Sequence, residues 1–394
     1  MQGSPPPADK IIRFQDGSGY RFPQLRWSFA HYRQLVPTVT VSKGLTPCTP
    51  LPQASHALPD IRYTPMGETR VCRWTDMMEA TYTDALLVMH RGQVVFEHFG
   101  GVMTPLHQHI AMSVSKSFMG MLAAGLVTEG VLDEAQRVDH YLPELAGSGF
   151  GDATLRQVMD MTTAIDYTEN YADPQAEIWK HMRAGGVMPR LADDSGPGNF
   201  YDYLKTVRKL GEHGEQFTYR TANTDVLGWI VRRVSGKNNE DLLSERIWQP
   251  MGAELDAYYT VDPTGTAFAG GGLNTGLRDL ARFGELVRLQ GRVGNMQVLP
   301  AAAVADTFAG ADPARFAANG PVTLKGWSYR NMWWVSHNAH GAIMARGVHG
   351  QNIYIDPKAD MVIARYASHP VAANIANDPH TLPAYHAMAL ALLG

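Results

Sequence analysis

The sequence has few cysteines, few lysines and no long apolar run. Only two of its 394 residues are cysteine, Cys48 and Cys72, and neither has a second cysteine close by. This argues against a structural zinc site, and free thiols are expected rather than a disulfide. The longest mostly apolar stretch, 118–127, is too short to cross a bilayer, so we expect no membrane association.

The charge balance excludes binding to nucleic acid by bulk charge. Lysine and arginine together number 34, of which only nine are lysine, against 38 acidic residues. The formal net charge is −4, and no basic patch stands out along the chain. With 45% hydrophobic and 18% charged residues, the composition is typical of a soluble globular protein and excludes intrinsic disorder.

The N-terminus carries no secretory signal of the usual form. It reads Met-Gln-Gly-Ser-Pro-Pro-Pro, without a basic start followed by an apolar run. A cytoplasmic location is therefore the default expectation. The sequence does not fix the assembly, and a homodimer is compatible with it.

The pattern along the chain predicts an α/β region built from both ends and a mainly helical region between them. A β-hairpin is expected over 84–97 around a His-Arg-Gly turn. Apolar spacing predicts helices over 116–130, 155–161, 224–234, 278–290 and 380–393, and strands over 332–336, 351–355 and 361–367. Residues 167–214 are expected to be irregular and rich in loops.

This order of elements predicts three regions. Residues 1–75, rich in proline and aromatic residues, are expected to form an arm packed on the body. The α/β region then comprises 76–110 and 265–394, and the helical region 111–264.

The most informative motif is Ser-Val-Ser-Lys at 113–116. A serine hydroxyl is a poor nucleophile unless a neighbouring base takes its proton, and a residue three positions along a helix lies on the same face. At a helix start, Ser113 would also lie beside free backbone N–H groups that favour a developing oxyanion. The alternative is a capping serine followed by a solvated lysine.

Two further motifs follow later in the chain. Tyr219 begins the run Tyr-Arg-Thr-Ala-Asn-Thr-Asp-Val-Leu-Gly, and residues 347–352 read Gly-Val-His-Gly-Gln-Asn. Together with Ser113 and Lys116, these runs resemble the serine-reactive family of class C β-lactamases, penicillin-binding DD-peptidases and related esterases. The resemblance covers about residues 75–394. It implies an α/β plus all-α protein with an antiparallel sheet flanked by helices and a helical insertion.

Within that family the chain is most similar to the subfamily of 6-aminohexanoate-dimer (nylon-oligomer) hydrolases and their carboxylesterase relatives. Ser-Val-Ser-Lys-Ser, Ala-Asn-Thr-Asp-Val-Leu and Gly-x-His-Gly-Gln-Asn are shared, as is Ile-Asp-Tyr at 165–167 followed by Tyr171. The resemblance implies that Tyr171 contacts the substrate amide. A buried aromatic residue that anchors its loop is the alternative.

The resemblance also assigns roles to the other site residues. Ser113 would attack an ester or amide carbonyl, while Lys116 and Tyr219 would act as one proton-handling unit. Which of these two is the general base stays open. The backbone N–H groups of Ser113 and Arg346 would form the oxyanion hole, with Gly347 in the same strand.

Two other assignments have structural alternatives. His349, beside the last motif, is a candidate substrate-binding residue or a structural pocket wall. Tyr219 taken alone could equally be a core tyrosine. Trp327, Trp333 and Trp334 are expected mostly in the core, with one lining the acyl pocket.

The chain departs from the family pattern at three positions. Thr221 replaces the asparagine of Tyr-x-Asn, Ala345 replaces the lysine of the Lys-Thr-Gly strand, and Gly270 stands where efficient dimer hydrolases carry a polar side chain. Without that lysine, the carboxylate of β-lactams and D-amino-acid peptides loses its usual partner. The departures favour a carboxylesterase or linear amidase.

The sequence therefore predicts a serine hydrolase of small esters or amides that needs no metal or cofactor. A β-lactamase or D-amino-acid peptidase and a non-catalytic penicillin-binding-like ligand binder are the alternatives within the family. A metal hydrolase would have to use His107 with His109 or His337 with His340, and neither pair has the acidic partner of a zincin helix.

Overall fold

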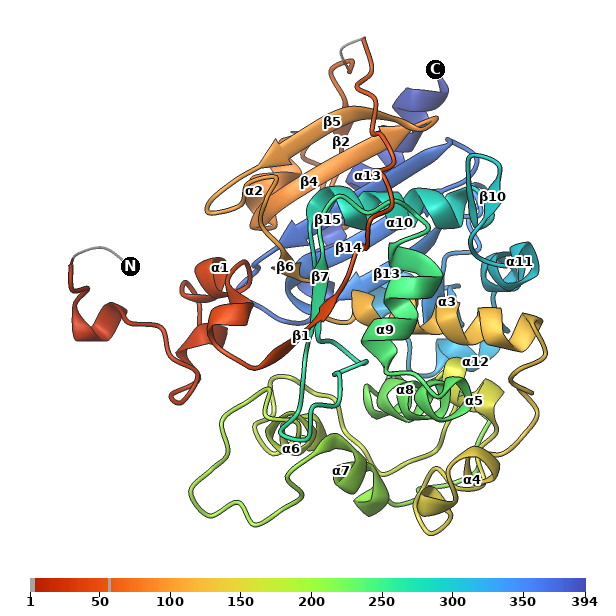
Figure 1. Ribbon diagram of the computed structural model, residues 1–394. Coiled ribbons are helices and arrows are strands. Elements are labelled where there is room, and N and C mark those ends of the chain that lie inside the picture. Colours follow the sequence, from red (N-terminus) through yellow and green to blue (C-terminus); the bar gives the residue numbers. More distant parts are fainter. Residues whose placement is uncertain (1–3, 56–57) are drawn as a thin grey trace.

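A seven-stranded antiparallel sheet organises the upper part of the computed structural model, which describes residues 4–55 and 58–394 (Figure 1). Its strand order is β11-β12-β13-β14-β15-β4-β5. The bounds are β4 Thr83–His90, β5 Gln93–Phe99, β11 Ser328–Arg330, β12 Trp333–Val335, β13 Ile343–Gly347, β14 Gln351–Asp356 and β15 Met361–Ala367. The predicted hairpin is confirmed, and β15 pairs with β4, so segments from both parts of the chain complete one sheet.

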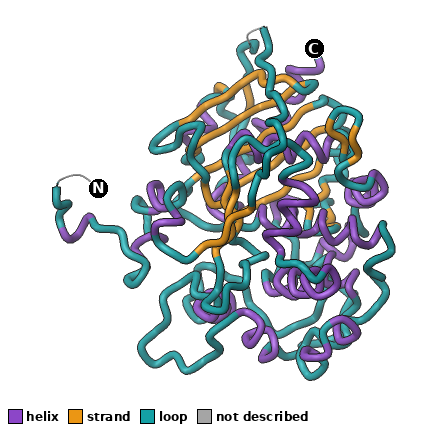
Figure 2. Tube along the Cα trace, in the orientation of Figure 1, coloured by secondary structure: helices purple, strands orange, loops and turns teal. Residues whose placement is uncertain are grey.

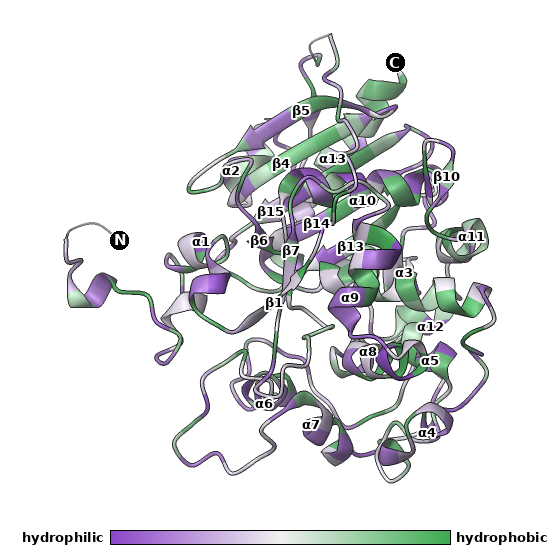
Figure 3. Cartoon of the chain, in the orientation of Figure 1, coloured by the Kyte–Doolittle hydropathy of each residue, from purple (hydrophilic) through white to green (hydrophobic). Residues whose placement is uncertain are grey.

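Two helices cover opposite faces of this sheet. Side chains alternate between the faces of a strand. Ile353 of β14 lies against α10 (Leu277–Arg288), at the position of Gly284, whereas the ring of the next residue, Tyr354, contacts Tyr385 of α13 (Asp378–Leu393). Apolar residues run along β4, while the edge strand β5 carries both apolar and polar stretches (Figure 3).

The helices of the middle of the chain lie below the sheet (Figures 1 and 2). They are α3 Val114–Thr128, α4 Val138–Tyr141, α5 Leu155–Met159, α6 Glu177–Ala184, α7 Phe200–Thr206, α8 Ala222–Ser235 and α9 Asn239–Leu243, and α11 Ala301–Ala309 and α12 Pro313–Ala317 follow later in the chain. The long helix α3 packs against both α8 and β13. It therefore connects the helical region to the sheet.

The helix predictions are confirmed to within a few residues, and the helix ends have clear causes. Gly130 after α3 and Gly236 after α8 both adopt left-handed φ values, 73° and 66°. Only glycine adopts this conformation without steric cost, and it ends a helix in this way. The region 167–214 is not wholly irregular, because it contains α6 and α7.

A second, four-stranded sheet was not predicted. Its order is β1-β7-β8-β6, formed by Thr38–Val41, Ala257–Thr260, Leu273–Thr275 and His109–Ile110. The sheet lies between the main sheet and the helices and takes one strand from the first 75 residues. Short two-stranded pairs, β2 Arg62–Tyr63 with β3 Cys72–Arg73 and β9 Arg292–Val293 with β10 Met296–Gln297, complete the strands.

Parts of the first 75 residues pack on the body, some within the main core and some through a small apolar cluster. In it, Leu25, Phe29 and Tyr32 meet Ile110 and Met112. α1 Leu25–Ser28 supplies one of these residues, and α2 Asp76–Ala80 follows the segment. Met112 directly precedes the predicted nucleophile, so this segment lies next to the site. No helix of the described residues has the length and apolarity that crossing a membrane would require.

Candidate active site

Ser113 and Lys116 lie side by side at the N-terminal end of α3. The Lys116 Nζ donates a hydrogen bond to the Ser113 Oγ over 2.9 Å. The Ser113 side chain makes no capping hydrogen bond, and both side chains are buried. The alternative of a capping serine and a solvated lysine is therefore wrong.

The surroundings of Lys116 favour its neutral form. Burial lowers the pKa of Lys116 to about 8, and the carboxylates of Glu169 and Asp225 oppose that shift. A buried ammonium loses its hydration, which makes release of the proton easier. At a pH near 8 a large fraction of Lys116 is thus a neutral amine within hydrogen-bonding distance of the serine.

The segment before β8 holds Lys116 in place from the other side. The Gly270 carbonyl accepts a hydrogen bond from the Lys116 Nζ, and the Gly270 N–H donates to the Asp225 Oδ1 over 3.1 Å. Asp225 is on α8, and its other oxygen lies 3.2 Å from the His181 Nε2. His181 is fully buried, and its Nδ1 lies 2.9 Å from the Tyr167 hydroxyl. These contacts fix the carbonyl that orients the lysine.

Tyr219 completes the predicted trio. Burial raises the pKa of Tyr219 and the Glu169 carboxylate adds to the increase, while a side-chain hydrogen bond with Ser113 acts in the opposite direction. The Lys116 Nζ lies 5.3 Å from the centre of the tyrosine ring. The ring stacks on Trp334 with centroids 5.3 Å apart, which holds it in position. Tyr219 is therefore a phenol rather than a phenolate.

Glu169 was not predicted, and it links two predicted positions. Its carboxylate accepts hydrogen bonds from the Tyr171 hydroxyl at 2.5 Å, the Thr221 N–H at 2.5 Å and the Thr221 hydroxyl at 2.7 Å. Thr221 thus binds Glu169 where the family pattern has an asparagine. A Cβ on Gly270 would lie 2.6 Å from the Thr221 methyl group, so these two departures from the family pattern fit together in space.

The end of β13 approaches Ser113 closely. A Cβ on Gly347 would lie 2.7 Å from the Ala111 carbonyl oxygen, so only glycine allows this contact. The next residue, Val348, lines the cavity beside Ser113. Arg346 is not among the lining residues, although its guanidinium lies near enough to Tyr219 to act on its pKa.

The Arg346 side chain lies on the face of the sheet that α13 covers, and its guanidinium also lies 5.4 Å from the centre of the Trp334 ring, which stacks on Tyr219. Arg346 pairs across the strands with Asn352, which hydrogen-bonds Tyr385 of α13. There its guanidinium forms a buried ion pair of 2.6 Å with Asp378. Asp378 thus compensates the positive charge, while the buried Arg346 Nη1 has no hydrogen-bond partner among the described residues.

A cavity of about 620 Å³, including the solvent at its mouth, opens at Ser113. His349 lines it together with Tyr171. The His349 Nδ1 lies 2.7 Å from the His369 carbonyl and must donate to it, and burial lowers the pKa of His349 to about 4. This histidine is a neutral wall of the cavity. Of the three tryptophans named from the sequence, Trp333 and Trp334 are in the core and none lines the cavity, which Trp179 lines instead.

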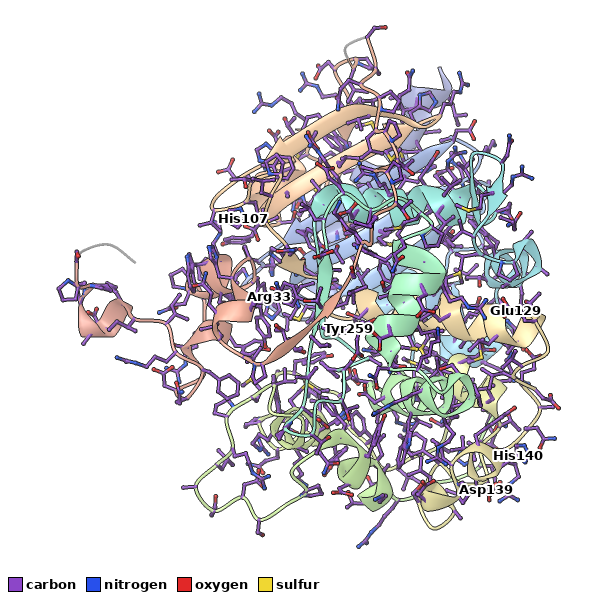
Figure 4. The ribbon with its side chains drawn as sticks, viewed as in Figure 1. Arg33, His107, Glu129, Asp139, His140 and Tyr259 are labelled. Atoms are coloured by element: carbon purple, nitrogen blue, oxygen red, sulfur yellow. The ribbon has the colours of Figure 1, made fainter. Side chains whose placement is uncertain are left out.

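The histidines considered as metal ligands lie apart from such a cluster. His107 hydrogen-bonds Thr104 and lies against His31 of the N-terminal segment (Figure 4). His340 pairs with Asp356 at 2.7 Å. Within the described residues, no three His, Cys, Asp or Glu side chains are grouped to hold a metal ion.

This fold and site are those of a large family. The chain belongs to the beta-lactamase family, whose model matches residues 75–386. The predicted family and fold are thus confirmed, and the chain is a hydrolase of that family.

The chain is also similar to individual proteins of known name and to solved structures. Over 349 residues the chain is 38% identical to the 6-aminohexanoate-dimer hydrolase of Paenarthrobacter ureafaciens, covering 88% of this chain and 86% of that one. A solved Bacillus anthracis structure, provisionally named a 6-aminohexanoate-dimer hydrolase, matches with TM-score 0.85 and 30% identity over 98% of this chain and 97% of that one. The hydrolase EstCE1, described as having promiscuous acyltransferase activity, shares the fold with TM-score 0.62 and 16% identity over 81% and 96% of the two chains.

The predicted residues thus fall into two groups. Ser113, Lys116 and Tyr219 come together, and Tyr171 and His349 line the adjoining cavity. Gly347 makes a close backbone approach, whereas the Arg346 side chain does not line the cavity and pairs with Asp378. Glu169 and Asp225 were not predicted, although Glu169 lies two residues before Tyr171 and Asp225 lies one helical turn after Thr221.

Proposed function

We propose that the protein hydrolyses small carboxylic esters or linear amides through an acyl-enzyme on Ser113. The observation that carries this proposal is the 2.9 Å contact between the Ser113 Oγ and a buried lysine with a lowered pKa. Such a pair is the arrangement by which a weak hydroxyl nucleophile is activated. The relatives named as 6-aminohexanoate-dimer hydrolases support an amide or ester as the substrate.

In the proposed reaction, neutral Lys116 takes the proton of Ser113 as its Oγ attacks the carbonyl carbon. Tyr219, whose pKa is raised, donates a proton to the leaving alcohol or amine and recovers one from Lys116. Water then attacks the acyl-enzyme, with the same base taking its proton. The base then returns this proton to the Ser113 Oγ as the bond to the acyl group breaks, so the product acid leaves and Ser113 is restored.

The developing oxyanion would be bound by backbone N–H groups. Ser113 supplies one, at the start of α3, where the helix dipole also favours negative charge. For the second, we propose Val348 in place of Arg346, because Val348 lines the cavity and follows the close approach of Gly347.

The structure favours this function over two alternatives. A β-lactamase or D-amino-acid peptidase needs a cation for the substrate carboxylate, and the Arg346 charge is already paired with Asp378 in a buried contact. A binder without turnover has no need of a buried lysine beside the serine, because burial of that charge destabilises the fold.

A fluorophosphonate probe and p-nitrophenyl esters test the proposal together. We expect turnover of p-nitrophenyl esters and one label, on the peptide that contains Ser113. Ser113→Ala should lose both, while Ser115→Ala, a neighbouring serine on the same helix, should keep the label. Retained turnover in Ser113→Ala, or labelling elsewhere, would contradict the proposal.

A further inference from the structure

The cavity beside Ser113 is lined without any charged side chain from the described residues. None of its lining residues is Asp, Glu, Lys or Arg. One wall comes from α6 and the segment after it, with Ile178, Met182, Val187 and Met188. Tyr20 of the N-terminal segment forms part of the opposite wall. The lining is therefore apolar and aromatic over most of its surface.

The polar groups of the cavity are already used within the protein. His349 donates from Nδ1 to the His369 carbonyl and stays neutral at ordinary pH. The Tyr171 hydroxyl donates to Glu169. These groups leave no charge to compensate an ion on the substrate.

The charged groups nearest to the cavity are held by contacts within the protein, Lys116 by Ser113 and the Gly270 carbonyl. The Glu169 carboxylate accepts three hydrogen bonds, two from Thr221 and one from Tyr171. Arg346 is paired with Asp378 in the buried contact described above. An ammonium or carboxylate that entered the cavity would lose its hydration and find no oppositely charged side chain among the lining residues, which is unfavourable.

We infer that this cavity takes an uncharged apolar arm of the substrate and rejects a charged one. The inference rests on the proposed hydrolysis at Ser113 and names its substrate class: neutral esters or amides with an alkyl or aryl arm. 6-Aminohexanoate dimer, the substrate in the name of the relatives, carries an ammonium on one half and a carboxylate on the other. The cavity of this protein thus fits a neutral substrate better than the charged dimer, although the fold is the same.

Two matched substrate pairs test this inference. The first is p-nitrophenyl hexanoate against p-nitrophenyl 6-aminohexanoate, which places the charge on the acyl arm. The second is hexyl acetate against 6-aminohexyl acetate, which places it on the alcohol arm. For the pair whose long arm enters the cavity, we expect kcat/KM to be about 100-fold or more higher for the neutral member. The reason is that burying an unpaired ion in an apolar site is unfavourable. Ratios near one for both pairs would overturn the inference.

A substitution in the cavity wall tests whether this cavity causes the preference for the neutral substrate. Met188 is partly exposed, so a carboxylate there remains tolerable to the fold. Met188→Glu should reduce the preference for the neutral substrate by about tenfold or more by pairing with the ammonium, whereas Met188→Gln should leave it unchanged. An unchanged preference in Met188→Glu would overturn the assignment to this cavity.

The outcomes separate this inference from the proposed function. Turnover and labelling at Ser113 with no discrimination would overturn the inference alone. Absence of both turnover and labelling would overturn the proposed function and the inference together.

Discussion

Replacing Lys116 with methionine should abolish activity. At neutral pH it should also remove the free energy by which the buried lysine destabilises the folded state. Methionine has a similar length and no charge. Wild-type protein at pH 7 must keep an ammonium buried in its interior or release the proton. The variant has no such requirement, so its stability should respond differently to pH.

The magnitude follows from the proton affinity of the lysine. Its pKa falls from 10.5 to about 8 on folding. Each tenfold change in proton affinity corresponds to about 1.4 kcal/mol. The lowered pKa therefore reduces the free energy of unfolding by about 3 kcal/mol at pH 7. The unfolded chain binds this proton more tightly, so the stability of the wild type increases as pH rises from about 8 to 10.5. At pH 10 the lowered pKa still reduces the free energy of unfolding by about 1 kcal/mol.

The substitution also has a cost that does not depend on pH. It leaves the Gly270 carbonyl without its lysine partner, which destabilises by about 1–3 kcal/mol. The stability difference between Lys116→Met and wild type is therefore best compared at two pH values. Between pH 7 and pH 10 this difference should shift by about 2 kcal/mol in favour of wild type.

Denaturant unfolding at the two pH values, followed by tryptophan fluorescence, measures this shift. Lys358→Met provides the matched control, because Lys358 is exposed. A difference that is the same at pH 7 and pH 10 would refute the lowered pKa of Lys116. In wild type, kcat/KM should in addition rise with pH through about 8, as the base loses its proton.

Four further outcomes test other parts of the structure. Tyr219→Phe should lower kcat by about 10²–10⁴-fold with little change in melting temperature, because the ring keeps its stacking and loses only the proton donor; wild-type rates would remove it from the mechanism. Asp225→Asn should move the pH midpoint of kcat/KM lower, because the lost carboxylate favours the protonated lysine; a midpoint moved upward would contradict this. Gly120→Ala should destabilise by about 1–3 kcal/mol in denaturant unfolding, since the new Cβ would meet a backbone carbonyl oxygen at 2.0 Å. Ellman's reagent should react with Cys48 in the folded protein and reach Cys72 only after unfolding, because the first is exposed and the second buried; two reactive thiols in the native state would contradict the packing.

Local patterns account for the parts of the structure that the sequence predicted well. Ser113 and Lys116 are three residues apart on one helix, so their contact follows from helix geometry. The hairpin of β4 and β5 has a two-residue turn in which Arg91 and Gly92 both have positive φ, 49° and 78°. Such turns match the twist of the strands, which explains why a short segment was sufficient to predict them.

The parts that were missed depend on contacts between distant segments. Glu169 meets Thr221 across 52 positions, and nothing in the neighbourhood of either residue indicates that pairing. The strands of the second sheet have only two to four residues each, too few for an alternating pattern to emerge. The orientation of Arg346 depends on strand register, and a shift of one residue would turn its side chain to the other face.

The pairing of β15 with β4 has a consequence for how the protein is made. Arg365 on the later strand hydrogen-bonds Thr83, 282 residues earlier in the chain. During synthesis, the apolar residues Leu86, Leu87 and Val88 therefore leave the ribosome long before their neighbouring strand exists. Until translation is nearly finished, this edge is open to aggregation, and folding of the sheet is slow because its contacts are non-local. A nascent chain of this protein should accordingly be a client for chaperones until its last strand has emerged.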